Sequence, residues 1–261
     1  MKSTERQHFL MAKAKKANFI SIPGAAEELG VSVETIRRDI NILCAQNQLR
    51  KVHGGAVPVK TALHKDALFS QRLKQYQGRK LAVVNEASKY IRDGDVVALD
   101  GGATTVQLVE ILQDKHNVTF VVNSLPLADA LTRKFREGAL TGHLIFIGGE
   151  INTNSLYATD AYAINALDKF HFDIAFLSCT SLSANSVCNS SLSIYPTHMV
   201  NQATTSILIL DSSKLGNTST YEFAKPTDFA QIIVDDQAPV PQDLLQVLEN
   251  SDTKLTIVNC D

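Results

Sequence analysis

Apolar residues near the amino terminus recur at helical spacing. Ile36, Ile40 and Leu43 fall at positions i, i+4 and i+7, so they form one stripe along a helix. Two further helices are predicted before it, over residues 4–17 and 20–29. Together the three segments predict a small helical unit at the start of the chain.

The third predicted helix carries polar residues away from its apolar stripe. Ser32 precedes it and is a good N-cap, because its hydroxyl accepts from the free N–H groups of the first turn. Glu34 and Arg38 stand four residues apart and are expected to pair. Arginine and asparagine make bidentate contacts with base edges, and serine and threonine reach phosphates. The residues of this segment predicted to bind DNA are Ser32, Glu34, Thr35, Arg37, Arg38 and Asn41.

A basic hairpin is predicted directly after this helix. Leu49, Val52 and Val57 anchor two short strands, and Gly54 and Gly55 supply positive φ at the tip. A lone pair of arginines is typical of an ordinary solvated helix. A tight turn, paired helices and a basic hairpin in this order favour a winged helix-turn-helix that binds duplex DNA. The hairpin residues expected to touch phosphates or enter the minor groove are Arg50, Lys51, His53, Gly54 and Gly55.

From Lys80 onward, short β-branched runs alternate with helix-like segments. The runs lie at residues 96–99, 118–122, 144–147, 174–177, 207–210, 232–234 and 255–258. Near-continuous apolar strands with helices between them predict an α/β domain whose mostly parallel sheet is covered on both faces. We therefore expect a winged helix-turn-helix domain over residues 1–60, a linker over 61–78 and an α/β effector-sensing domain over 79–261.

Glycine-rich and polar segments follow several of the predicted strands. Ligands of such sheets bind at the carboxyl ends of the strands. The segment 100–105 precedes a helix, so its glycines, hydroxyls and free helix N–H groups predict an anion site of phosphate size. Each segment alone is typical of a turn, and only their recurrence at successive strand ends favours a ligand site. The predicted effector-binding residues are Asp100, Gly101, Gly102, Thr104, Thr105, Asn123, Ser124, Gly148, Gly149 and Lys214.

Charge is divided unevenly along the 261 residues. Residues 1–60 hold ten lysines and arginines against five acids, a net +5, and the remainder holds fifteen against twenty-two, a net −7. A basic head on an acidic body is typical of a DNA-binding domain joined to one that does not bind DNA. No apolar run approaches the roughly 20 residues that span a bilayer, and no signal peptide is apparent. A cytoplasmic location is therefore expected.

The four cysteines form no Cys-x-x-Cys pair, and no histidine lies at metal-ligand spacing from them. Reduced thiols are expected, and neither a metal nor a cofactor is predicted. Cys179 and Cys188 share one Ser- and Asn-rich stretch and are the pair in which redox chemistry is worth testing.

The segments 35–40 and 53–56 closely resemble the recognition helix and wing of the DeoR-type bacterial transcriptional repressors. The resemblance extends over nearly the whole chain, and the further segments that match in order and spacing are 100–105, 123–125, 148–149, 172–176 and 211–214. It implies a winged helix joined to a sugar-phosphate sensor domain that looks like ribose-5-phosphate isomerase. It also implies a repressor of carbohydrate-metabolism genes that a phosphorylated sugar releases from its operator.

The chain departs from the family pattern in its second half. From residue 174 to residue 210 there is no charged side chain, where the family usually has a helix with a glutamate and a lysine. Asp160 stands near a position at which the family often has glycine. These departures keep open a repressor that has lost its effector and binds DNA constitutively.

An enzyme is the other alternative that the resemblance raises. Aldose–ketose isomerisation needs a positioned carboxylate base and an electrophile for the oxyanion. The isomerases carry acidic residues just after the strand that corresponds to 174–177, and this chain is neutral there. We therefore expect no catalytic residues, and we expect at least a dimer, because one winged helix contacts too few base pairs for operator selectivity.

Overall fold

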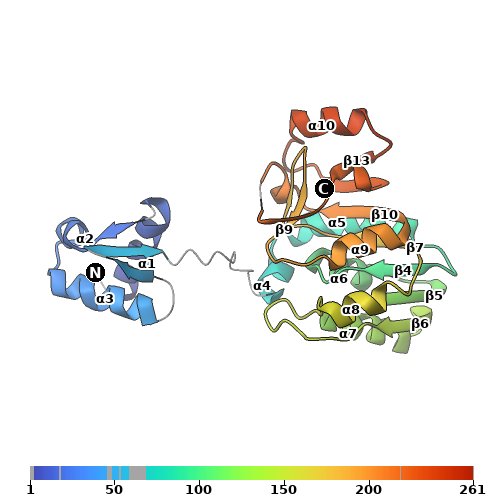
Figure 1. The fold of residues 1–261 in the computed structure, drawn as a ribbon, viewed down its shortest axis with the longest axis horizontal. Helices are drawn as coiled ribbons and strands as arrows, with labels where there is room; N and C mark the ends of the chain where they lie inside the picture. The colour runs from blue at the N-terminus through green and yellow to red at the C-terminus, as the bar shows by residue number, and fades with distance from the viewer. Residues whose placement is uncertain are drawn as a thin grey trace. The chain divides into compact units, whose positions relative to one another are not determined.

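The computed structural model describes residues 3–17, 19–45, 49–52, 54–58, 69–217 and 219–260 (Figure 1). The chain forms two compact units, residues 1–64 and 65–261. Each unit has its own core, and we describe each one by itself. Among the described residues, no helix has both the length and the apolar character needed to cross a membrane.

The described residues of the first unit form three helices and a small antiparallel sheet. The helices are α1 (Ser3–Ala17), α2 (Ile22–Leu29) and α3 (Val33–Ala45), and the strands are β1 (Ile20–Ser21), β2 (Leu49–Val52) and β3 (Gly55–Pro58). The strands pair in the order β1-β3-β2, and β2 and β3 form the predicted hairpin. The winged helix-turn-helix predicted from the sequence is confirmed.

Local capping explains where α2 and α3 begin and end. The Ser21 hydroxyl accepts from the amide of Gly24 at 3.3 Å, and Gly30 ends α2 in the left-handed conformation with φ of 61°. The apolar stripe of α3 is fully buried, since Ile36 and Ile40 are at most 1 % exposed. They pack with Leu10 of α1, which orients α3 within the unit.

The second unit is built on a seven-stranded sheet. Its strands are β4 (Val96–Leu99), β5 (Lys115–Val122), β6 (Leu140–Phe146), β7 (Phe172–Leu177), β10 (Ala203–Leu210), β12 (Gln231–Asp235) and β13 (Lys254–Val258). They lie in the order β13-β12-β10-β7-β4-β5-β6, and every neighbouring pair is parallel. All seven strands predicted from apolar runs are present.

Helices cover both faces of this sheet, as Figure 1 shows. One face packs against α5 (Gln77–Ala87), α6 (Ala103–Ile111) and α7 (Leu125–Arg136), and the other against α8 (Ala161–Leu167), α9 (Tyr195–Gln202) and α10 (Gln242–Glu249). Strand residues alternate between the two cores: Ile207 and Ile209 face the first, and Leu208 and Leu210 face the second. Burial on both faces explains the apolar runs of the central strands β4, β7, β10 and β12.

The order of the strands creates a point where the chain reverses direction across the sheet. The chain starts at β4, runs outward through β5 and β6, then returns to β7 on the other side of β4. Crossovers from β4 and β7 therefore leave in opposite directions, and a crevice forms outside the carboxyl ends of these two strands. This crevice is where a sheet of this kind binds its ligand.

Two features of the second unit differ from the expectation. Residues 69–74, which the sequence analysis assigns to the linker, form the helix α4 (Phe69–Lys74), and Phe69 is buried in the core. A second sheet of three short antiparallel strands is also present, formed by β8 (Ser181–Leu182), β9 (Val187–Asn189) and β11 (Tyr221–Ala224). Strands of two to four residues are too short to give a readable alternation of apolar and polar positions.

Candidate functional site

The exposed side of α3 and the hairpin border one shallow hollow on the first unit. The residues that line it are Ile22, Pro23, Val33, Glu34, Arg37, Ile40, Asn41, Lys51, Val52, Gly54 and Gly55. Six residues predicted to bind DNA are therefore brought together from two elements that are separate in sequence. A helix beside a hairpin, with basic side chains on both, has the shape and charge that fit duplex DNA.

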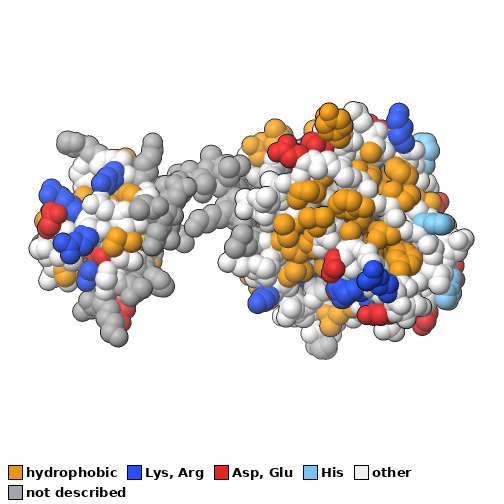
Figure 2. Space-filling model, turned by 90° about the horizontal axis from the view of Figure 1, so that it is seen from below, with side chains coloured by type: hydrophobic (Ala, Val, Ile, Leu, Met, Phe, Trp, Pro, Cys, Tyr) orange, Lys and Arg blue, Asp and Glu red, His pale blue; other side chains and the backbone are white. Residues whose placement is uncertain are grey.

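The remaining residues predicted to bind DNA do not line this hollow. Ser32 and Arg38 are exposed, and Thr35 is half-buried next to the Ser32 cap. The Ser32 hydroxyl lies 2.8 Å from the Thr35 hydroxyl and accepts from the Thr35 amide at 3.2 Å. Arg50 belongs to β2, and His53 lies outside the described residues. Basic side chains are prominent on the face of this unit seen in Figure 2.

Two details of the predicted surface need correction. Glu34 pairs with Arg37, at 3.4 Å, and not with Arg38, so the i+3 neighbour takes the place expected for the i+4 neighbour. Only Gly54 has positive φ, at 78°, whereas Gly55 does not. Gly55 is required for a different reason, because a Cβ atom there would lie 2.0 Å from the carbonyl oxygen of Ile20.

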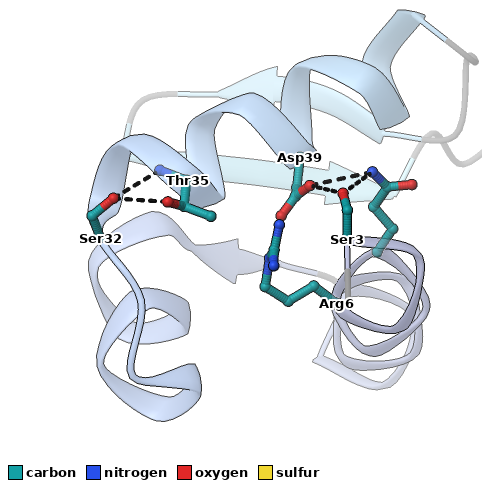
Figure 3. Close-up of polar contacts among 6 residues, drawn as sticks. Ser3, Arg6, Ser32, Thr35 and Asp39 are labelled. Carbon is teal, nitrogen blue, oxygen red and sulfur yellow. Dashed lines mark hydrogen bonds and ion pairs between the residues drawn. The ribbon is translucent and has the colours of Figure 1, made fainter. Parts of the chain in front are cut away.

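Asp39 is a functional residue of α3 that sequence reasoning missed. Its carboxylate is buried and accepts from Arg6 Nε at 2.6 Å, Ser3 Oγ at 2.9 Å and Gln7 Nε2 at 3.2 Å (Figure 3). All three donors belong to α1, so Asp39 fixes α3 against α1. The signal in the sequence was its place at i+3 within the apolar stripe of Ile36, where a solvated acid is not expected.

Burial of the Asp39 carboxylate acts to raise its pKa, but hydrogen bonds from Arg6, Ser3 and Gln7 act in the opposite direction. The net result is a pKa below the ordinary value of 3.8. Asp39 is therefore ionised under all ordinary conditions. Its negative charge points toward α1 and leaves the outer side of α3 basic.

The second unit has a small polar pocket at the chain reversal between β4 and β7. The residues that line it are Arg72, Asp100, Gly101, Gly102, Asn123, Tyr157, Thr159, Ser178, Asn189, Ser191, Ser193, Tyr195 and Pro196. Asp100, Asn123 and Ser178 directly follow β4, β5 and β7, three neighbouring strands of the sheet. Of the ten predicted effector-binding residues, Asp100, Gly101, Gly102 and Asn123 lie in this pocket.

The Asp100 carboxylate organises the floor of the pocket. It accepts from the amide of Ser178 at 2.7 Å, the amide of Gly102 at 3.0 Å and the hydroxyl of Thr105 at 3.0 Å. Burial raises its pKa above the ordinary value, although these hydrogen bonds act to lower it. Asp100 thus ties the loop after β4 to the end of β7 and shapes the crevice.

The two glycines of this loop are required by close packing. A Cβ atom at Gly101 would lie 2.4 Å from the Tyr157 ring, and one at Gly102 would lie 2.0 Å from Ser178 Oγ. Glycine at both positions lets the loop lie directly against the pocket wall. Gly102 is also the N-cap of α6, so the loop places the pocket beside a helix amino terminus, the end of a helix that favours an anion.

Two side chains of the pocket have buried polar atoms that lack hydrogen-bond partners within the described part of the chain. They are Nε and Nη2 of Arg72 and Oδ1 of Asn123. Asn123 is 1 % exposed, and its amide nitrogen donates to the carbonyl of Ala158 at 2.5 Å. Leaving such atoms unsatisfied costs free energy, so the pocket has free donors for an anion and a free acceptor for a hydroxyl.

Comparison with known proteins identifies both domains. Residues 6–62 match the DeoR-like helix-turn-helix domain, and residues 75–236 match the DeoR C terminal sensor domain. The chain belongs to the DeoR family of transcriptional regulators. The family expected from the recognition-helix and wing motifs is therefore confirmed.

Several curated members of the family are similar over most of their length. The HTH-type transcriptional regulator IolR of Bacillus subtilis is 33 % identical over 226 residues, which are 84 % of this chain and 85 % of IolR. The HTH-type transcriptional repressor GlcR of the same organism is 28 % identical and covers 100 % of this chain and 98 % of GlcR. The lactose phosphotransferase system repressor of Streptococcus mutans is 27 % identical, covering 91 % and 94 %.

Solved structures with a distant similarity include a sugar-phosphate isomerase. Ribose 5-phosphate isomerase A of Methanocaldococcus jannaschii is 18 % identical with a TM-score of 0.34, and the match covers 52 % of this chain and 53 % of the isomerase.

Six of the predicted effector-binding residues of this DeoR-family chain lie outside the pocket lining: Thr104, Thr105, Ser124, Gly148, Gly149 and Lys214. The Thr105 hydroxyl is committed to oxygens of its own loop, including the Asp100 carbonyl at 2.7 Å. Gly149 packs against Asp160, which caps α8 by accepting from the amide of Ala163 at 2.9 Å. A ligand contact by these six stays a prediction that the pocket itself does not support.

The sequence analysis missed the pocket residues contributed by the uncharged region 174–210. That region supplies Ser178, Asn189, Ser191, Ser193, Tyr195 and Pro196. The lack of charge in this region suggested a degenerate pocket. In the structure, hydroxyl and amide side chains of the region form a polar, neutral wall of the pocket. The wealth of serine and asparagine between residues 178 and 193 was the available signal.

Proposed function

We propose that this DeoR-family regulator is a repressor of carbohydrate-metabolism genes that binds operator DNA through α3 and the hairpin, and that a phosphorylated sugar releases it. The proposal rests most of all on the unsatisfied atoms of Arg72 and Asn123 in one pocket. The DNA half rests on the surface that α3 and the hairpin form together.

On the DNA side, we assign base contacts to α3 and backbone contacts to the hairpin. Arg37, Arg38 and Asn41 are exposed on α3, and arginine and asparagine suit the edges of guanine and adenine. Lys51 of β2 is exposed on the neighbouring strand and suits a phosphate. Ser32 and Thr35 lie at the start of α3, which is the end that approaches base edges when a recognition helix enters the major groove.

The chemistry of the pocket favours a small anion that also carries hydroxyl groups. The donors of Arg72 suit a phosphate, since guanidinium binds it bidentately, and the pocket lies beside the N-cap of α6, where a helix amino terminus favours negative charge. Asn123 Oδ1 accepts one hydroxyl, and the serine and asparagine side chains of the wall offer both donors and acceptors for others. A sugar phosphate has both properties. A functional pocket also argues against a constitutive repressor.

Catalysis is not part of this proposal. Asp100 is the only carboxylate that lines the described pocket, and it is held by hydrogen bonds from Ser178, Gly102 and Thr105. A general base must be free to take a proton from the substrate, whereas this carboxylate accepts hydrogen bonds that hold the loop after β4. We also propose a cytoplasmic location, because a bacterial repressor acts on DNA in the cytoplasm, and a dimer or larger homo-oligomer, because two-fold operators mirror protein symmetry.

A selection from random duplexes with the full chain, followed by fluorescence anisotropy, tests the function. We expect salt-dependent binding to a selected two-fold site and its loss when the correct sugar phosphate is added. A thermal-shift panel of sugar phosphates identifies the effector, since a ligand at a hundred times its Kd stabilises a fold by about 2.7 kcal/mol. Turnover of any sugar phosphate, or absence of duplex affinity, would contradict the proposal.

A further inference from the structure

The hollow bordered by α3 and the hairpin has exposed apolar side chains as well as basic ones. Val33 is 38 % exposed and Val52 is 36 % exposed, and both line the hollow. Neither packs in the core of the first unit, which is formed by residues such as Ile36 and Leu10. Phosphate contacts explain the basic side chains of this surface, but they do not explain exposed valines.

Val33 lies on the same side of α3 as two residues proposed to contact bases. Val33, Arg37 and Asn41 follow one another at intervals of four residues, which places them in one row along the helix. All three line the hollow. Val33 is the first residue of α3, directly after the Ser32 cap, and the amino-terminal residues of a recognition helix contact base edges. The row therefore offers a base edge one aliphatic side chain, one guanidinium and one carboxamide.

The apolar group that base edges present in the major groove is the C5 methyl group of thymine. An exposed aliphatic side chain at the leading end of the helix suits this methyl group, as arginine suits guanine and asparagine suits adenine. An α-helix rises about 1.5 Å per residue and bases are about 3.4 Å apart, so side chains four residues apart reach bases about two steps apart. This spacing predicts where the thymine stands relative to the base that Arg37 contacts.

Resting on the DNA-binding function proposed above, we propose that Val33 determines operator specificity by packing on the methyl group of a thymine within about two base pairs of the base that Arg37 contacts. The contact removes two apolar groups from water, which favours binding. Val33 thereby distinguishes thymine from the other bases without a hydrogen bond.

Deoxyuridine is the probe, because it pairs as thymidine does but lacks the methyl group. An operator is selected from random duplexes with the full-length chain, and the base pair at which Arg37→Ala loses its preference marks the Arg37 position. Each thymine of one half-site is then replaced in turn by deoxyuridine, and fluorescence anisotropy measures the affinity of each duplex for the wild-type chain and for Val33→Ala.

The matched control is Ile42→Ala. Ile42 is a β-branched residue of the same helix, it is 37 % exposed, and it does not line the hollow. Alanine favours a helix more than valine or isoleucine does, so α3 is kept in both variants. Circular dichroism checks this.

We expect one deoxyuridine near the Arg37 position to weaken binding by the wild-type chain and by Ile42→Ala about fourfold, which corresponds to about 0.8 kcal/mol for one buried methyl group. Val33→Ala should bind the thymine and deoxyuridine duplexes about equally. Equal sensitivity of wild type and Val33→Ala would overturn the inference, and so would a selected site without a thymine near the Arg37 position. If Val33 packed on deoxyribose, no deoxyuridine would change the affinity, and that result would overturn it too.

The failure of this inference is distinguishable from the failure of the proposed function. If the wild-type chain binds the selected operator with salt-dependent affinity and ignores every deoxyuridine substitution, the role of Val33 falls and the DNA-binding function stands. If the wild-type chain has no salt-dependent affinity for any duplex, the repressor function falls and the inference falls with it.

Discussion

Replacement of Asp39 by asparagine tests how α3 is held in its DNA-binding position. The substitution keeps the size of the side chain but removes the charge that pairs with Arg6 at 2.6 Å. Hydrogen bonds to a charged group contribute about 1.5–3 kcal/mol, and breaking a buried ion pair costs about 3–5 kcal/mol. The Arg6 side chain keeps 13 % exposure and recovers part of this in water, so we expect a loss of about 2–3 kcal/mol.

Hydrogen exchange in the full-length chain measures this loss within the first unit alone. A loss of about 2–3 kcal/mol corresponds to amide exchange in α1 and α3 that is about 30- to 150-fold faster. The matched control is Glu28→Gln, which breaks the exposed ion pair of Glu28 with Lys13 in the same unit. Exposed pairs contribute about 0–1 kcal/mol, so the control should change exchange less than about fivefold.

The pH dependence of stability tests the same role of Asp39 independently. Asp39 has a folded-state pKa below 3.8, so its contribution to stability is complete above about pH 4 and is lost as the pH falls through the folded-state value. The stability difference between wild type and Asp39→Asn should therefore shrink in acid. Equal exchange in Asp39→Asn and Glu28→Gln at neutral pH would refute the role given to this carboxylate.

Three other changes test the remaining parts of the account. Arg38→Ala should lose about 1–3 kcal/mol of affinity for the selected operator alone, whereas Lys51→Ala should weaken binding to all duplexes alike and lower the salt slope by about 0.9. Fluorescence anisotropy with operator and with random DNA separates the two results. Unchanged binding by both variants would show that this surface does not bind DNA. Gly55→Ala should destabilise the first unit by about 1–3 kcal/mol, because its Cβ would lie 2.0 Å from the Ile20 carbonyl oxygen. Gly24→Ala is the control, since the nearest atom to its Cβ would be at 3.6 Å. Equal unfolding midpoints of the two variants would contradict the packing argument. Burial lowers the pKa of Lys80 to about 8, so its positive charge near Arg72 is lost as the pH rises through that value; sulfate affinity should fall between pH 7 and 9, and a flat profile would show that this charge does not reach the pocket.

Much of the fold was predictable because its signals are periodic. Burial on both sides gives the central strands β4, β7, β10 and β12 their apolar runs, and burial on one side gives α3 its stripe. Helix caps and tight turns act locally, so they can be recognised from the sequence, as at Ser21, Ser32 and Gly30.

The candidate pocket was predictable only in part, because its lining comes from segments that meet through tertiary structure. Asp100 and Asn123 follow apolar strands, and the strand-end rule found both. Arg72 lies in a short helix with weak periodicity. The wall from Ser178 to Pro196 comes from loops, the short strand β9 and the first turn of α9, where no repeating pattern marks the inward side. Lys214 was among the residues expected to bind the effector, and the basic residue that lines the described pocket is instead Arg72.

Anisotropy of a labelled operator duplex with the full-length chain tests the central claim most directly, namely that one chain binds DNA with its first unit and responds to an anionic metabolite with its second. The account predicts an affinity that falls linearly with the logarithm of salt concentration. It also predicts that the effector sugar phosphate lowers the operator affinity of the wild-type chain at least tenfold. A chain with no salt-sensitive affinity for any selected duplex would contradict the account.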